Sequence, residues 1–212
     1  LMGTKVYVQT LGCPKNLVDS EIMLGLAARE GAEIVLDPEA ADVYLVNTCA
    51  FIGPAKQESI DAILELARYK EVDPSRRLIV TGCLAQRYGA DLQDSLPEVD
   101  AFLGTGDFDR LPEILQQRPR PDASRYGGAA HLLPDLDLPR LRTGAFYSAY
   151  LKVSEGCDHK CSFCIIPKIR GRHQSRPLDS VLAEAERLVS EGVVEINLIA
   201  QDLTAYGRDL RN

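Results

Sequence analysis

The hydrophobic pattern of the first 117 residues alternates between two kinds of segment. Short runs of apolar and β-branched residues are typical of buried strands, and longer segments repeat apolar residues at helical spacing, as Ile60, Ile63, Leu64 and Ala67 do. The pattern predicts strands at 5–10, 33–36, 42–47, 77–81 and 101–103, and helices at 16–30, from 54 onward, after 83 and at 108–116. Because strands alternate with helices, we expect a parallel sheet with helices on both faces.

The first expected helix carries polar residues close to its start. Asn16 is expected to be its N-cap and Gly31 to end it. A functional role is open for Asn16, Asp19 and Glu21, but capping and favourable contact with the helix dipole explain these residues about equally well.

A second series of elements begins after a segment rich in proline and glycine. Residues 118–144 are expected to be a linker between a first domain at 1–117 and a second at 145–212. The second domain should contain a strand at 149–154, a helix at 178–190 and a strand at 195–200, as at the start of a (β/α) barrel. The apolar face of this helix is expected to contain Leu178, Val181, Leu182, Ala185 and Leu188. Two strands cannot close a barrel, so we expect a fragment of a longer protein.

Composition narrows the class of protein. The chain has 212 residues, of which 45% are hydrophobic, and this is enough to bury a substantial core. No apolar run is long enough for a transmembrane helix, and the first residues do not resemble a signal peptide. A net charge of −7 argues against a general nucleic-acid-binding surface. We expect a cytoplasmic protein with no membrane partner, in which clustered cysteines bind metal or take part in catalysis.

Three of the cysteines occupy equivalent positions in the first domain. Cys13, Cys49 and Cys83 each follow an expected strand and precede an expected helix, at intervals of about one βαβ repeat. Ligand sites of such sheets lie at the carboxyl ends of the strands, where helix N-termini favour a thiolate. We therefore expect the three thiols at one sheet edge, as ligands of an iron–sulfur cluster. The alternative is three unrelated buried cysteines, since free cysteine is often buried.

The other three cysteines form a compact motif. Cys157, Cys161 and Cys164 have the spacing CxxxCxxC. Three thiolates suit a four-iron cluster that keeps one iron open for a small molecule. A zinc site would need a fourth ligand, for which His159 and His173 are the candidates. A disulfide set is disfavoured in a reducing compartment.

The CxxxCxxC spacing resembles the signature of radical S-adenosylmethionine (SAM) enzymes. The resemblance implies that the open iron chelates SAM, that an electron from the cluster cleaves it to a 5′-deoxyadenosyl radical, and that Phe163 lies near the adenine. Together with Cys13, Cys49 and Cys83, the motif resembles the methylthiotransferases of this superfamily over roughly residues 5–210. The implied cofactors are two 4Fe–4S clusters and SAM, and the implied fold is a flavodoxin-like cluster-binding domain followed by a radical SAM barrel.

Within that family, the segment Leu-Gly-Cys-Pro-Lys-Asn at 11–16 looks like the branch that modifies a ribosomal protein. The segments at 154–167 and Gln201-Asp202 look like the same branch. The resemblance implies methylthiolation of the β-carbon of an aspartate of small-subunit ribosomal protein twelve. It also implies a remaining barrel and a substrate-binding domain beyond residue 212. The donors of electrons and of sulfur stay unidentified, and nucleic acid is not expected as a partner of these residues.

Three alternatives stay open. A tRNA-modifying methylthiotransferase is disfavoured by the acidic charge balance and by Pro14-Lys15, where that branch typically has Gln-Met. A non-catalytic iron–sulfur module and a structural zinc domain are the others. Four basic residues follow the motif and are expected either to bind a carboxylate of SAM or of the substrate, or to belong to a solvated loop. They are Lys168, Arg170, Arg172 and Arg176.

Overall fold

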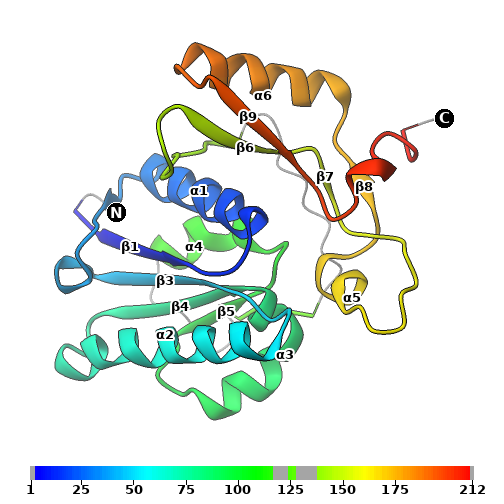
Figure 1. The fold of residues 1–212 in the computed structure, drawn as a ribbon. Coiled ribbons are helices and arrows are strands. Elements are labelled where there is room, and N and C mark those ends of the chain that lie inside the picture. The colour runs from blue at the N-terminus through cyan, green and yellow to red at the C-terminus, as the bar shows by residue number, and fades with distance from the viewer. Residues whose placement is uncertain (1–2, 117–123, 128–137, 211–212) are drawn as a thin grey trace.

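A five-stranded parallel sheet forms the first half of the protein (Figure 1). The computed structural model describes residues 3–116, 124–127 and 138–210. The strand order is β2-β1-β3-β4-β5, the order of flavodoxin-like folds. The strands are β1 (Lys5–Thr10), β2 (Glu33–Ile34), β3 (Val43–Thr48), β4 (Arg77–Gly82) and β5 (Ala101–Leu103). The predicted fold class, a parallel α/β sheet followed by the start of a second unit, is confirmed.

Helices cover both faces of this sheet. Helices α1 (Pro14–Arg29) and α4 (Leu111–Gln116) pack on one face, and α2 (Gly53–Val72) and α3 (Cys83–Ser95) pack on the other. Strand β3 is buried along its whole length, so its alternating side chains serve two cores. Tyr44 and Val46 belong to the core beneath α2 and α3, and Val43 and Leu45 belong to the core beneath α1. A short 3-10 turn, η1 (Pro38–Ala40), precedes β3.

Two predicted helix boundaries are wrong. The first helix begins at Pro14, and its N-cap is Cys13, three residues before the predicted cap Asn16. Proline suits a first helical position because its missing N–H would have no partner there. The predicted helix at 108–116 is divided into a 3-10 turn, η2 (Phe108–Arg110), and the short α4.

The second half is built on the parallel pair β6 (Ser148–Lys152) and β9 (Glu195–Ile199), which α6 (Leu178–Ser190) connects. Between them lie α5 (Ile166–Arg170) and an antiparallel pair that the sequence did not predict, β7 (Ser154–Glu155) with β8 (Gln174–Ser175). A turn, η3 (Leu203–Ala205), follows β9. The expected apolar face of α6 is only partly correct, because Val181 and Leu188 are buried whereas Leu178 and Leu182 are half exposed.

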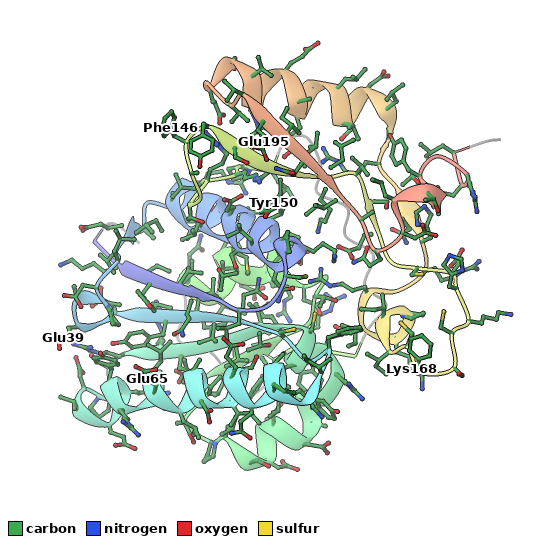
Figure 2. All side chains as sticks on the ribbon, in the orientation of Figure 1. Glu39, Glu65, Phe146, Tyr150, Lys168 and Glu195 are labelled. Atoms are coloured by element: carbon green, nitrogen blue, oxygen red, sulfur yellow. The ribbon has the colours of Figure 1, made fainter. Side chains whose placement is uncertain are left out.

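Helix α1 lies between the two sheets and joins the two halves (Figure 1). Tyr150 of β6 points toward this helix and packs against its core (Figure 2). The junction also contains buried ion pairs: Arg140 binds Glu21 of α1 at 2.6 Å and Glu184 of α6 at 2.8 Å. Arg140 belongs to the segment expected as a linker, of which residues 118–123 and 128–137 lie outside the described residues. None of the described helices is both long and apolar enough to cross a membrane.

Glu184 gives the junction a predictable pH dependence. Burial raises the pKa of its carboxyl, but the charges of Arg176 and Arg140 outweigh burial and lower it below the ordinary 4.5. The ion pairs therefore stabilise the fold fully above pH 4.5, and this contribution is lost as the pH falls toward the lower, folded-state pKa. Below pH 4.5, we expect the free energy of unfolding to decrease less steeply with falling pH in Glu184→Gln than in the parent protein. Denaturant titration at several pH values measures this. Glu186→Gln, a change at an exposed position of the same helix, should show the same pH dependence of the unfolding free energy as the parent protein.

Candidate metal centre

Cys13, Cys49 and Cys83 meet at the carboxyl edge of the five-stranded sheet. Cys13 follows β1, Cys49 follows β3, and Cys83 is the first residue of α3 after β4. Strands β1 and β3 are neighbours at the point where the strand order reverses, the usual ligand position in such sheets. The three residues line one cavity of about 500 Å³. The structure thus places the three thiols together, as their spacing predicted.

Glycines allow these loops to approach one another closely. Gly12 has φ +89°, and a Cβ added there would lie 2.8 Å from Cys49 Cβ and 3.0 Å from its Sγ. Gly82 has φ +94°, and an added Cβ would lie 2.3 Å from the Asn47 side chain. Both backbone conformations strain any residue with a side chain. The loops that carry the thiols therefore depend on glycine for their spacing.

The CxxxCxxC loop reaches the same cavity from the second half of the protein. Cys157 and Cys164 line the cavity together with the three thiols of the first half. The Cys157 N–H donates to the Gly171 carbonyl at 3.1 Å, and the Cys164 N–H donates to the Cys161 carbonyl at 3.1 Å. Cys161 is exposed and does not line the cavity. Five of the six cysteines of the chain therefore surround one space.

The other walls of the cavity are mainly apolar. Phe51, Ile52 and Ala55 come from the loop after β3 and the start of α2, and Ile166 comes from α5. Lys15, Arg170 and Gln201 supply polar atoms. Phe163 is 89% exposed and is not part of the lining. Lys168, also exposed, lies on the α5 side of the molecule (Figure 2).

Burial dominates the chemistry of the free Cys83 thiol. Burial raises the pKa of this thiol, as do the nearby Cys49 and Cys13, whereas the Arg170 guanidinium lowers it. For Cys83 as a free thiol, burial therefore outweighs the groups that favour the thiolate. The positive charge of the neighbouring Arg170 opposes the cost of burying a negatively charged Cys83 thiolate.

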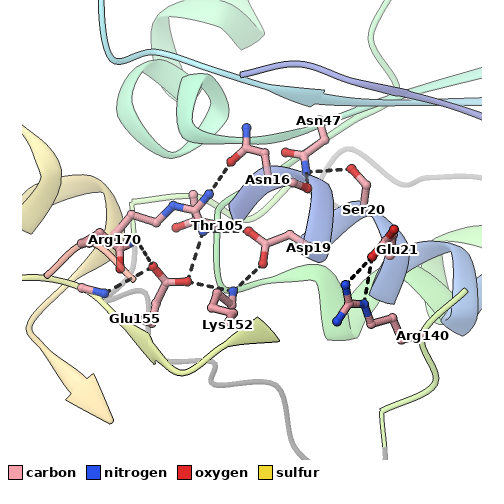
Figure 3. A network of polar contacts seen from close by, with 12 residues as sticks. Asn16, Asp19, Ser20, Glu21, Asn47, Thr105, Arg140, Lys152, Glu155 and Arg170 are labelled. Atoms are coloured by element: carbon pink, nitrogen blue, oxygen red, sulfur yellow. Dashed lines mark hydrogen bonds and ion pairs between the residues drawn. The ribbon is translucent and has the colours of Figure 1, made fainter. Parts of the chain in front are cut away.

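The basic residues after the motif do not form a solvated loop. Arg170 and Arg176 are almost fully buried, and only Lys168 and Arg172 are exposed. Arg176 binds Glu184 at 2.5 Å and the Lys152 carbonyl at 2.9 Å. Arg170 binds Asp19 of α1 at 2.7 Å and Glu155 of β7 at 3.2 Å (Figure 3). The solvated-loop interpretation is therefore wrong for these two residues, and binding of a SAM or substrate carboxylate by one of the four basic residues stays a prediction.

Sequence reasoning missed a buried polar network between the two halves (Figure 3). Lys152 of β6 binds Asp19 at 2.5 Å and Glu155 at 2.9 Å. The Asn16 amide nitrogen donates to the carbonyls of Leu11 and Thr48, at 2.9 and 3.0 Å, and its oxygen accepts from Arg170. Asn16 and Asp19 thus have tertiary partners and no capping role. The signal in the sequence was their placement one helical turn apart within a largely apolar helix.

The two histidines considered as zinc ligands have other partners. His159 lies 2.8 Å from Asp202, and His173 lies 3.0 Å from the Ser175 hydroxyl. Among the described residues, no group of three or more His, Cys, Asp or Glu side chains is arranged to hold a metal ion. A zinc ion needs four donors that converge on one point. His159 and His173 are therefore held by other side chains, and metal analysis, not this geometry, separates zinc from an iron–sulfur cluster.

Two family models match the two halves. Residues 5–104 match the uncharacterized protein family UPF0004, and residues 151–210 match the radical SAM superfamily. Among curated proteins, the chain is 55% and 56% identical over 207 residues to proteins named ribosomal protein uS12 methylthiotransferase RimO, from Geotalea uraniireducens and Geobacter sulfurreducens. Each alignment covers 97% of this chain and 46% of the relative. A protein of the same name from Myxococcus xanthus is 50% identical over 211 residues.

The fold and the site therefore agree with the family matches. The α/β domain with three thiols at its ligand-binding edge matches UPF0004, and the unit with the CxxxCxxC motif matches the radical SAM superfamily. The chain is similar over nearly all of its length to proteins named ribosomal protein uS12 methylthiotransferase RimO. It spans about half the length of these curated relatives.

Proposed function

We propose that these residues are the cluster-bearing part of a radical SAM methylthiotransferase that modifies ribosomal protein uS12. The observation that carries the proposal is the common cavity, because thiols of both cysteine sets line it. The names of the relatives support the substrate. The proposed reaction adds a methylthio group to the β-carbon of an aspartate. That carbon is unactivated, so its reaction calls for radical chemistry.

The donor set fits two iron–sulfur clusters. Cys13, Cys49 and Cys83 would hold the first, and Cys157, Cys161 and Cys164 would hold the second and leave one iron for SAM. The fit rests on chemistry: thiols are the preferred ligands, and the cavity is lined by all three thiols of the first set and by Cys157 and Cys164 of the second. When bound, the clusters and SAM supply the one-electron chemistry and the sulfur transfer that the reaction needs.

The protein's own residues shape the site. Phe51, Ile52 and Ile166 line the cavity with apolar groups, and Phe51 and Ile52 are more than half exposed, so this wall would exclude water from a reactive intermediate only once the site is covered. Gln201 lines the cavity and donates to Glu155, and this bond holds the end of β9 against β7. Phe163 is proposed to stack near the adenine of SAM, which would cover its exposed ring.

The partners follow from the proposed reaction. They are SAM, a ribosomal protein, a reductant and a sulfur donor, the last two unidentified. We propose a cytoplasmic protein that needs neither membrane nor nucleic acid, organised as a first domain (1–117), a linker (118–144) and a second domain (145–212). The tRNA-modifying alternative differs only in substrate. Parallel assays with a uS12 peptide and with tRNA, using the whole protein, separate the two.

The cluster content is the first test. After anaerobic reconstitution, we expect about eight iron per chain in the parent and about four in a Cys13/Cys49/Cys83 triple-alanine variant, one four-iron cluster per cysteine set. The matched control is the Cys157/Cys161/Cys164 triple-alanine variant, which should also retain about four. Only the parent and the first variant should cleave SAM to 5′-deoxyadenosine.

Three outcomes contradict the proposal. About four iron in both the parent and the first variant would remove the N-terminal cluster and, with it, the methylthiotransferase interpretation. Colourless protein that binds zinc in place of iron would show a structural zinc domain. Iron in both sets without SAM cleavage would favour the non-catalytic iron–sulfur module.

A further inference from the structure

Arg170 lies where the two halves and the cavity meet. Its side chain is only 2% exposed, yet it lines the cavity together with the thiols. Arg170 is the last residue of α5, in the second half. Its side chain donates hydrogen bonds to Asn16 and Asp19 of α1, in the first half. A buried cation of this kind is unusual without a specific partner set. Arg170 therefore connects the loops that carry the two cysteine sets.

One hydrogen-bond partner of Arg170, Asn16, lies next to the Cys83 sulfur. The Asn16 side-chain oxygen accepts from Arg170 and lies 3.8 Å from Cys83 Sγ. The same amide donates to the carbonyls of Leu11, in the loop before Cys13, and of Thr48, the last residue of β3 before Cys49. Asn16 thus ties the three loops of the first set together, and Arg170 places a positive charge behind them.

The charges around Arg170 balance. Lys152 and Arg170 are positive, Asp19 and Glu155 are negative, and four ion pairs join them. We call these four residues the buried quartet. All four are shielded from water, so a change in any one charge would be felt by neighbouring groups more strongly than at a surface. The quartet is neutral, and single substitutions can make it either negative or positive.

We propose that Arg170 is a positioning residue for the first cluster, whose reduction potential is set by the charge of the buried quartet. The inference rests on the proposed function, since it needs a cluster on Cys13, Cys49 and Cys83. The net charge near a cluster and the hydrogen bonds to its sulfurs control its potential. A negative quartet disfavours the extra electron and lowers the potential, and a positive quartet raises it.

The test uses the Cys157/Cys161/Cys164 triple-alanine protein, so that only the first cluster is present. Its midpoint potential is measured by anaerobic titration with electron paramagnetic resonance detection, alone and with a further substitution. We expect Arg170→Met to lower the potential and Asp19→Asn to raise it. Arg170→Lys keeps the charge and should stay closer to the parent than Arg170→Met does.

Arg176→Met is the matched control. Arg176 is also an almost fully buried arginine with a carboxylate partner in the second half, but it does not line the cavity. Its loss should destabilise the fold without a shift in potential. If Arg170→Met fails to retain iron, Asp19→Asn still tests the inference. A general loss of structure would not raise the midpoint potential, whereas a positive quartet would.

The outcomes separate the inference from the proposed function. Opposite shifts in Arg170→Met and Asp19→Asn, with none in Arg176→Met, support the inference. An unchanged potential in both quartet variants, or the same shift in Arg176→Met, overturns it while the cluster itself remains. Absence of iron in the triple-alanine parent overturns the proposed function and the inference together.

Discussion

Replacing Lys152 with methionine is expected to lower the free energy of unfolding by about 3 kcal/mol, because it leaves an unbalanced negative charge in the buried quartet. Lys152 is 1% exposed, and Asp19 and Glu155 both depend on it. Burial lowers the pKa of Lys152, but the two carboxylates outweigh burial and hold it above the ordinary value. Methionine has a similar volume, so the loss reports the charge and not a cavity. Urea unfolding at neutral pH measures it.

A double-mutant cycle makes this prediction specific. In Lys152→Met/Asp19→Asn the remaining pair, Arg170 and Glu155, is again neutral. We therefore expect the double variant to recover part of the lost stability, so the two changes should not add. Lys70→Met is the control, because Lys70 also pairs with an aspartate, Asp100, but at a partly exposed site. Its expected cost is below about 1 kcal/mol, and an equal loss in Lys70→Met and Lys152→Met would refute the role of burial.

The sequence predicted the fold because the signals for it are local. The strands of the first half alternate with helices, and short-range hydrophobic spacing shows this without knowledge of distant contacts. In the first half, β1 and β5 have the predicted bounds, β2 ends two residues early, β4 ends one residue late, and β3 is shifted by one residue. The start of α1 was misplaced because asparagine is a stronger capping residue than cysteine, whereas Asn16 was needed to tie three loops together.

The cysteines of the candidate site were also accessible from the sequence, because topology determines where they lie. A cysteine after each parallel strand must lie at the carboxyl edge, whatever the side chains around it. The buried quartet had no such signal. Asp19 and Arg170 are 151 residues apart in the chain, and an ion pair has no sequence period. Charged residues after the motif indicated a solvated or a ligand-binding loop. Only the tertiary structure shows that Arg170 is buried between the halves and Arg176 within the second half.

Gly156→Ala is expected to destabilise the protein by about 3 kcal/mol or more and to remove the second cluster, since backbone strain and steric overlap act together. Gly156 has φ +74°, and a Cβ added there would lie 2.0 Å from the Arg172 carbonyl oxygen and 2.7 Å from that of Gly171. The Gly171 carbonyl also accepts from the Cys157 N–H. Relief of the overlap must therefore move the first cysteine of the motif. Urea unfolding and iron content measure the two effects.

Gly192→Ala separates strain from overlap. Gly192 has φ +91°, but no atom lies within 4 Å of an added Cβ. Its alanine variant should lose only the backbone term, about 1 to 2 kcal/mol, and should retain about eight iron after reconstitution. Gly156→Ala should retain about four, all on the first cysteine set. If the free energy of unfolding and the iron content fall equally in both variants, then close packing of the Gly156 turn against residues 171–172 does not position Cys157. If iron falls only in Gly156→Ala, the turn is part of the metal centre, because the strain of a positive φ is common to both variants.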